Sequence, residues 1–325
     1  MTRRGKILSA VSALAVLAAA CVFLWWRINR PPEAVRLLPD PDAIVYVNLR
    51  PLRLASAFAK LPQVQHDPDY DEFMRASGFD FERDLDEAGI AVHLPPEAQA
   101  AQAEAKKNAP LAETRYSEAF VGRFNPDALT NYFQKIARSK EQYAGATIFT
   151  VPVEGRTVRL ALLSKRLAVV SNVEDASVIR GMIDRSRAQG FMASGPELVS
   201  DFYKEVPTGS LAWTIARSKH NLPLPNGLEL AMPEGVTWVG SLRLAAGLEL
   251  KAQAIAGNDA DAKQITESLN TMLAVFHSIQ SNVKTQGADA DVKQVFDSVQ
   301  VTQENNRAVV TASVPVGFLE KMAGK

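Results

Sequence analysis

The most pronounced hydrophobic pattern in the sequence is an uninterrupted apolar run from Ile7 to Trp26. A helix of about 20 apolar residues is long enough to cross the hydrocarbon core of a bilayer. The run ends at Trp25 and Trp26, and Arg27 and Arg30 follow. Tryptophan rings favour the membrane interface, and arginine side chains reach past it into water. The pattern therefore predicts a transmembrane helix with Trp25, Trp26, Arg27 and Arg30 at one membrane interface.

Three kinds of processing compete with a permanent span at this segment. Ala20 and Cys21 could form a lipoprotein signal, and ordinary cleavage after Ala20 could release a secreted protein. The apolar residues 22–26 argue against both, because they would remain as an apolar stub on the mature chain. A twin-arginine signal is the third alternative, but Lys6 stands where that signal has an apolar residue.

The charges flanking the run are nearly balanced, with basic residues on both sides. A short basic N-terminal tail usually stays in the cytoplasm, and a large downstream domain translocates largely regardless of its charge. We therefore expect a single-pass protein of the inner membrane with a cytoplasmic tail at 1–6 and a span at 7–26. The C-terminal domain is then extracytoplasmic, and residues 27–39, which include Pro31 and Pro32, form a stiff linker.

Beyond the linker, short apolar runs alternate with polar segments that start or stop helices. Residues 43–49 form a run rich in β-branched and aromatic residues between Pro41 and Pro51, which is typical of a buried strand. The same criteria predict strands at 90–94, 118–124, 146–151, 157–163 and 167–172, and helices at 52–61, 69–77, 82–89, 125–139 and 175–188.

The second half of the chain repeats this order loosely. Asn258 and Asp259 open a long helix that carries Ile265 and Leu269 on one face. Strands are predicted on either side of this helix, at 210–216, 237–246, 248–256, 299–303 and 308–314.

Strands joined by tight turns indicate antiparallel pairing. We expect an α+β protein in which the transmembrane helix is followed by antiparallel sheets with helices packed on one face. Two halves, residues 40–205 and 206–325, both run strands, helix, strands, helix, and this order suggests a structural pseudo-repeat.

Charge excludes one class of function. The 36 basic and 36 acidic side chains cancel, and the basic residues are scattered. Nucleic-acid binding normally requires a basic excess for the phosphate contacts. No nucleic-acid partner is therefore expected.

The sequence contains few candidates for catalysis or metal binding. The four histidines have no short metal-ligand spacing, and the single cysteine lies in the predicted span. Ser281 and Lys284 have the spacing of a serine–lysine acylase, but the serine closes a long helix instead of opening one. No phosphate-binding glycine loop, dinucleotide fingerprint or nucleophile elbow is present. We expect no cofactor and no metal, and the sequence identifies no catalytic residue.

Several short motifs follow the predicted span in a characteristic order. They are Leu38–Ala43 leading into a strand, a Gly78–Ala88 stretch with aromatic and acidic residues, and Gly122–Phe124 before a helix. Over residues 38–190 the chain resembles a group of uncharacterised, membrane-anchored bacterial envelope proteins. The resemblance implies the anchored architecture and the envelope location, and it carries no activity.

The expectation that follows is a membrane-tethered, non-enzymatic domain that contacts another envelope protein or the cell wall. A tether suits a partner that is itself fixed at the membrane. One alternative is a hydrolase-type enzyme whose site is assembled from distant residues. Another is a carrier that binds an apolar ligand between helices and sheet.

Overall fold

A computed structural model of the protein describes a large part of the chain beyond the predicted linker. The described residues are 30–54, 68–94, 115–153, 155–188, 195–218, 222–223, 229–230, 233–245, 247–282, 290–315 and 317–318. The predicted span at 7–26, with Trp25, Trp26 and Arg27, lies outside these residues. Within them, no helix has both the length and the apolar character that a membrane crossing requires.

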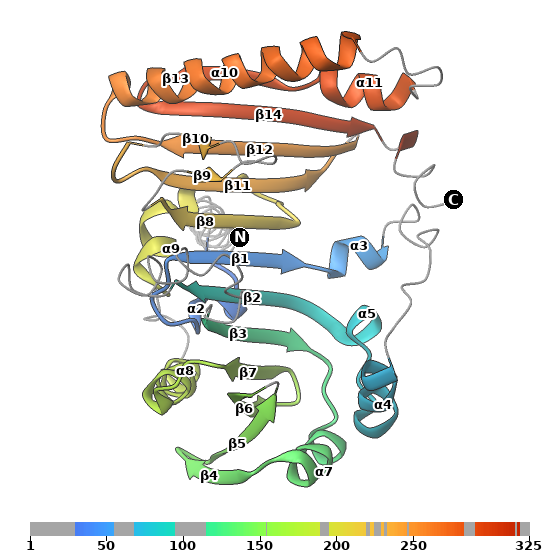
Figure 1. The fold of residues 1–325 in the computed structure, drawn as a ribbon. Coiled ribbons are helices and arrows are strands. Elements are labelled where there is room, and N and C mark those ends of the chain that lie inside the picture. Colours follow the sequence, from blue (N-terminus) through green and yellow to red (C-terminus); the bar gives the residue numbers. More distant parts are fainter. Residues whose placement is uncertain are drawn as a thin grey trace, which may run out of the picture.

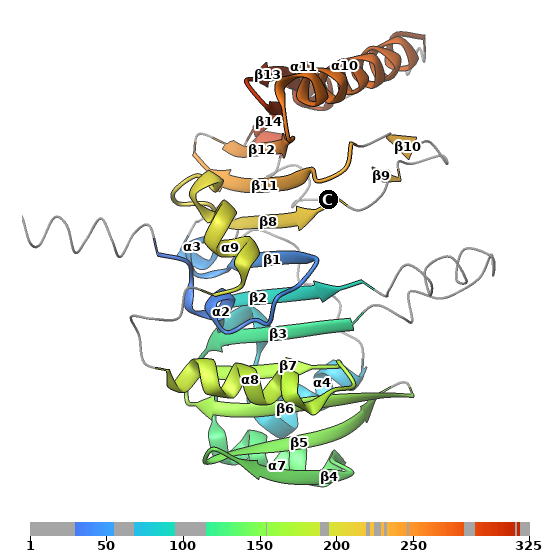
Figure 2. The same ribbon diagram turned by 90° about the vertical axis from the view of Figure 1, so that its left-hand side faces the viewer.

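One antiparallel sheet of twelve strands organises the described chain (Figure 1). From one edge to the other its strands are β13 (Gln300–Glu304), β14 (Arg307–Pro315), β12 (Gly247–Ile255), β11 (Thr237–Leu244), β8 (Ala212–Arg217), β1 (Ala43–Asn48), β2 (Leu85–His93), β3 (Arg115–Gly122), β7 (Leu167–Ser171), β6 (Arg156–Ser164), β5 (Ala146–Val153) and β4 (Ser139–Tyr143). A short ribbon of β9 (Leu222–Pro223) and β10 (Glu229–Leu230) stands out from the sheet (Figure 2).

The two halves of the chain share this one sheet, so the expectation of separate sheets is wrong. Strand β1 pairs with β8, with Ile44 opposite Ile215 and Tyr46 opposite Trp213. The physical reason is that a strand edge left open exposes unpaired backbone N–H and C=O groups. Each half satisfies the open edge of the other, and the sheet runs on without a break.

The helices are α2 (Glu33–Arg36), α3 (Arg50–Leu54), α4 (Pro68–Ser77), α5 (Phe81–Asp84), α7 (Pro126–Ile136), α8 (Ala176–Arg187), α9 (Glu197–Phe202), α10 (Asp259–Asn282) and α11 (Ala290–Asp297), with a 3₁₀ turn η3 (Tyr203–Glu205). We call the sheet face that carries Ile44 and Val169 the α8 face, because these residues share a buried cluster with residues of α8. The opposite face carries Ala254 and Ala308 under α10 and is called the α10 face.

Helices cover both faces, which corrects the expectation that they pack on one. On the α8 face, α2, α8 and α9 share a core cluster with β1, β3, β7 and β8. On the other face, α10 packs over β12 and β14, and α7 places Phe133 against Phe149. Neighbouring strand residues point to opposite faces, and Ile148 and Phe149 are 2% and 3% exposed. A strand that buries adjacent residues needs cover on both sides.

Two predicted helices end earlier than expected. The helix predicted at 82–89 stops at Asp84, and β2 begins at Leu85. Pairing with β1 and β3 and ion pairs of Asp86 hold this segment as a strand, and these contacts override local helix propensity. The helix predicted at 125–139 ends at Ile136, and Ser139–Tyr143 form the edge strand β4.

Candidate functional site

One row of laterally paired residues crosses all the strands from β5 to β13 on the α8 face. Its members are apolar in one half of the sheet and polar in the other. In the first half of the sheet its members are apolar, namely Ile148, Ala161, Val169, Ala119, Gly89 and Tyr46. In the second half it continues through Trp213 into polar side chains, namely Ser241, Lys251, Thr311 and Gln300. The change falls between Trp213 of β8 and Ser241 of β11.

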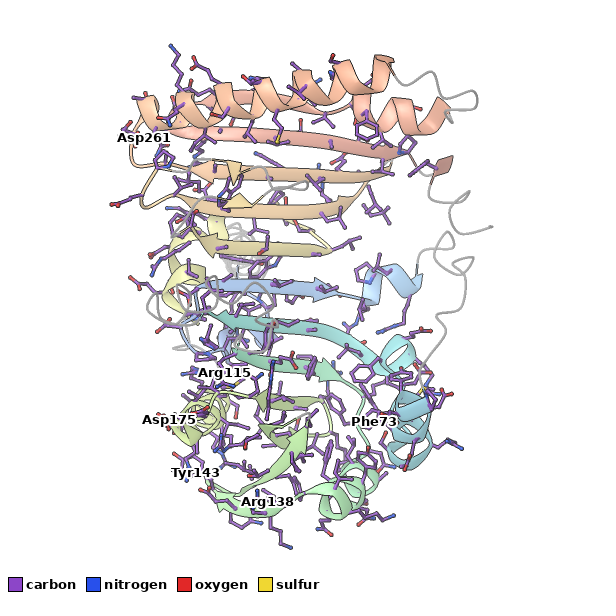
Figure 3. All side chains as sticks on the ribbon, in the orientation of Figure 1. Phe73, Arg115, Arg138, Tyr143, Asp175 and Asp261 are labelled. Atoms are coloured by element: carbon purple, nitrogen blue, oxygen red, sulfur yellow. The ribbon has the colours of Figure 1, made fainter. Side chains whose placement is uncertain are left out.

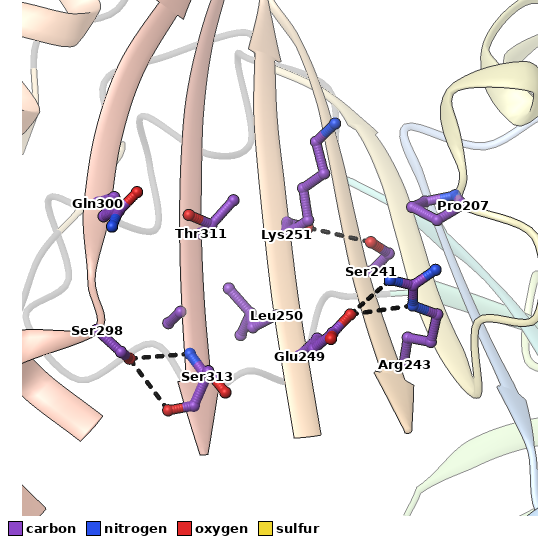
Figure 4. A pocket seen from close by; sticks show the side chains of 11 residues that line it. Pro207, Ser241, Arg243, Glu249, Leu250, Lys251, Ser298, Gln300, Thr311 and Ser313 are labelled. Carbon is purple, nitrogen blue, oxygen red and sulfur yellow. Dashed lines mark hydrogen bonds and ion pairs between the residues drawn. The ribbon is translucent and has the colours of Figure 1, made fainter. Parts of the chain in front are cut away.

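The polar part of the row lines a hollow in the sheet surface (Figure 4). Its volume is about 380 Å³, which lies in the range of small-ligand and peptide sites. Strand β11 contributes Ser241 and Arg243, strand β12 contributes Glu249 and Lys251, and Pro207 borders one side. The remaining lining residues are Leu250, Ser298, Gln300, Thr311, Ala312 and Ser313.

Most polar groups of the hollow are already hydrogen-bonded within it. Arg243 donates from Nη2 to Oε2 of Glu249 at 2.5 Å and from Nε at 3.1 Å. Ser298 Oγ donates to the carbonyl of Ser313 at 3.0 Å and accepts from its N–H at 2.9 Å (Figure 4). Within the described part of the chain, the Lys251 ammonium has no acceptor. The hollow therefore offers a preformed polar surface with one uncommitted positive charge.

A second polar centre lies at the bulged start of β2. Asp86 is 6% exposed and accepts hydrogen bonds from Arg50 at 2.8 Å and from Arg53. Arg166, from the turn between β6 and β7, lies 3.5 Å from the same carboxylate. Burial alone would raise the pKa of Asp86, but the hydrogen bond and charge of Arg50, together with Arg53, lower it.

Asp84 is held in the same way, because Arg83 bonds it at 2.5 Å and Arg123 lies 3.2 Å away. The Arg83 hydrogen bond lowers the pKa of the Asp84 carboxyl. Both carboxylates thus stay charged and paired, and they connect β2 to α3, to α5, to the end of β3 and to the β6–β7 turn. We interpret this centre as structural.

The adjacent Glu87 has the opposite behaviour. Burial raises its pKa despite a hydrogen bond with Tyr46, and one of its carboxylate oxygens is buried without a partner in the described chain. Burial also raises the pKa of Tyr46, which stacks on Trp213 at 5.3 Å. No nucleophile in the described residues is hydrogen-bonded to this pair.

A histidine–serine contact bears on the enzyme alternative. His93 Nε2 lies 3.2 Å from Ser117 Oγ, which lies 3.1 Å from Ser171 Oγ. Burial lowers the pKa of His93. Ser117 is 0% exposed, so its hydroxyl cannot meet a substrate and instead connects β2, β3 and β7. In the described residues, no group of three or more His, Cys, Asp or Glu side chains is placed to hold a metal ion.

The sequence-predicted interface residues are only partly placed. Trp25, Trp26 and Arg27 lie outside the described residues, and Arg30 is half-buried just before α2. There it lies close enough to Arg36 that its charge, after burial, contributes to lowering the Arg36 pKa. Sequence reasoning missed the hollow altogether. The signal that could have found it is the alternation of polar residues within β11, β12 and β14.

An apolar pocket lies on the α10 face between the sheet and helices α4 and α7. It has a volume of about 110 Å³, and every residue that lines it is apolar. Phe79 stacks on Phe124 at 4.8 Å, and Phe73 meets Phe81 at 5.9 Å. Figure 3 places Phe73 on α4, at the opposite end of the strands from Tyr143 beside α8.

Comparisons with known proteins identify no family. No protein-family model matches the sequence, and no curated protein is detectably similar to it. Solved structures of TP0453 in crystal forms III, I and IV are 11%, 10% and 12% identical to the chain, with TM-scores of 0.49, 0.45 and 0.44. They cover 90%, 90% and 91% of this chain, and 98%, 97% and 98% of TP0453 is covered. At these values the likeness assigns no function.

Proposed function

We propose that the protein is a membrane-tethered, extracytoplasmic binding module without enzymatic activity, and that it engages another envelope protein through the polar hollow of Figure 4. The observation that carries the proposal is the change along the cross-strand row. Apolar members are covered by α8 and α2 in the first half, whereas Ser241, Lys251 and Thr311 line the hollow in the second. A preformed polar surface at low conformational cost favours recognition of a partner.

The charge of the hollow indicates the chemistry of that partner. Arg243 and Glu249 neutralise one another, while Lys251 is left without an acceptor in the described residues. A complementary surface therefore presents an acidic group to Lys251 and hydrogen-bonding groups to Ser241 and Thr311. A tether through residues 7–26 would hold the hollow near a partner that is fixed at the same membrane.

Site-specific crosslinking in the native cells tests the proposal. A photoreactive residue replaces Thr311 in the hollow of the full-length protein, and the matched control replaces Glu267, whose side chain is 67% exposed on α10. The expected result is capture of one envelope protein from position 311 and not from 267. Lys251→Glu should reduce that capture at least fivefold, since it reverses the uncommitted charge.

Three outcomes would overturn the proposal. They are equal capture from both positions, capture no higher than in a chain lacking residues 7–26, and recovery of wall glycan in place of a protein. Topology is tested separately by fusing reporters to Lys325. We expect activity only from a reporter that functions outside the cytoplasm, and activity of the cytoplasmic reporter alone would reverse the orientation.

A further inference from the structure

On the α10 face, Glu118 stands in a cross-strand row whose two nearest members on either side are apolar. Glu118 of β3 pairs laterally with Ile90 on one side and Val170 on the other. Beyond Ile90 lies Val45, and beyond Val170 lies Leu160. A carboxylate in the middle of such a row is costly unless something pairs with it.

Glu118 does not itself line the apolar pocket described above, but it lies next to two residues that do. Phe120, two residues further along β3 and on the same face, lines the pocket, and so does Val170 directly across from Glu118. Burial alone raises the pKa of Glu118, and no charged or hydrogen-bonding side chain in the described chain contributes to the shift. The pocket is thus lined by aromatic and aliphatic side chains, and beside it lies a carboxylate that has no partner among the described residues.

The surroundings of the pocket add negative charge. Tyr132 of α7, which packs edge-on against Phe73, has its pKa raised by burial and further by Glu72 and Asp69. The nearby arginines Arg83 and Arg123 are bound to Asp84. These two arginines are therefore already paired, whereas Glu118 has no partner among the described residues.

We propose that this pocket binds a small organic cation, an arylalkyl or alkyl ammonium, with its apolar body among the phenylalanines and its charged nitrogen at Glu118. The aromatic faces attract a cation through their quadrupoles, and they do so more strongly where water is excluded. An apolar anion would meet Glu118 unfavourably, and a neutral ligand would leave the carboxylate unpaired.

This inference is independent of the proposed function, because the pocket and the polar hollow lie on opposite faces of the sheet and in different halves of it. Failure of one leaves the other standing. The two together would make the protein a tethered module with a ligand site of its own.

Ligand-observed fluorine NMR on the full chain in zwitterionic nanodiscs tests the inference. The probes are 4-fluorophenethylammonium, its neutral alcohol analogue and 3-(4-fluorophenyl)propanoate, each corrected for binding to empty nanodiscs. We expect the ammonium to bind at least tenfold more tightly than the alcohol, and the anion to bind most weakly. Equal affinity of the three probes would overturn the proposal.

Two variants test separately the charge of Glu118 and the space inside the apolar pocket. Glu118→Gln should bring the affinity for the ammonium probe within twofold of the affinity for the alcohol probe. The control Glu267→Gln on α10 should leave the tenfold preference for the ammonium intact. Ala168→Leu adds bulk to the pocket wall. It should lower the affinity for both probes at least tenfold, while the chain still unfolds cooperatively. A preference that survives Glu118→Gln, or binding that survives Ala168→Leu, would contradict the proposed site.

Discussion

The two halves of the sheet use the same face in different ways. From β5 to β1 the members of the cross-strand row on the α8 face are apolar and lie under α2, α8 and α9. From β11 to β13 the members of the same row are polar and line the hollow. Burial of apolar area is the main favourable term in folding, whereas an open polar face contributes little to stability. The first half therefore provides most of the packing, and the second half keeps a surface available for contact.

The buried charges follow the same division. Asp84 and Asp86 of the first half are buried and held by arginines. The Arg243–Glu249 pair of the hollow has side chains 46% and 41% exposed. Ion pairs of the second kind contribute little, because water screens them. Similar residue types thus stabilise the fold in one half and, in the function proposed above, would form a recognition surface in the other.

The largest effect on the free energy of unfolding is expected from core substitutions in the two halves. Ile179 of α8 and Ile265 of α10 are both 0% exposed. Ile179→Ala should lower the free energy of unfolding by about 4 kcal/mol and Ile265→Ala by about 2–3 kcal/mol, within the range for large-to-small core substitutions. Urea unfolding followed by circular dichroism measures both. Because β1 and β8 join the halves, each variant should unfold in one transition, and a split transition would break the comparison.

The next effect concerns the buried carboxylate. Asp86→Asn should lower the free energy of unfolding by about 2 kcal/mol, because a hydrogen bond to a charged group contributes about 1.5–3 kcal/mol. Glu249→Gln, the exposed counterpart, should cost less than about 0.5 kcal/mol. Chemical denaturation of both variants provides the measurement, and equal losses would remove the distinction between the halves.

The pH dependence of the Asp86 effect has a definite sign. The pKa of Asp86 is lowered below its ordinary value of 3.8, so its ionised form stabilises the folded chain. That stabilisation is present above pH 3.8 and is lost as pH falls through the lower folded pKa. The difference between wild type and Asp86→Asn should therefore shrink only in strong acid, and a difference that shrinks near neutral pH would contradict the assignment.

Glu118 should show the opposite sign. Its pKa is raised above the ordinary 4.5, so its charge destabilises the folded chain at neutral pH. Glu118→Gln should raise the free energy of unfolding at pH 7 by about 1 kcal/mol, at the low end of the cost of an unpaired buried polar group. The gain should disappear as pH falls toward 4. A loss of stability at pH 7 would show that Glu118 has a partner in the folded chain.

The smallest expected effect on stability is in the hollow. Lys251→Ala should change the free energy of unfolding by less than about 0.5 kcal/mol, as is usual for surface positions. It should nevertheless reduce photocrosslinking from position 311. Thermal unfolding and crosslinking yield together measure this separation, and a large loss of stability would assign the hollow to the fold instead of to binding.

The local elements of this protein were largely predictable from its sequence. Alternation in β5, β6 and β7 and the helical spacing in α8 are local patterns, and the structure confirms those strands and that helix. Local patterns were misleading at 82–89, where helix-favouring residues form the start of β2 because Asp86 meets arginines from α3 and from the β6–β7 turn. Such partners are distant in the chain and carry no local signal.

The candidate sites depended even more on the tertiary structure. The sequence by itself determined an apolar segment at 7–26, the absence of a basic excess and the period-two polarity of β11 and β12. Only the fold decided that β1 pairs with β8, that helices cover both faces, and that Ser241, Lys251 and Thr311 share one hollow. The physical reason is that strand pairing depends on backbone hydrogen bonds that any residue can make. Side-chain periodicity therefore fixes which face a residue occupies, but not which strand lies beside it.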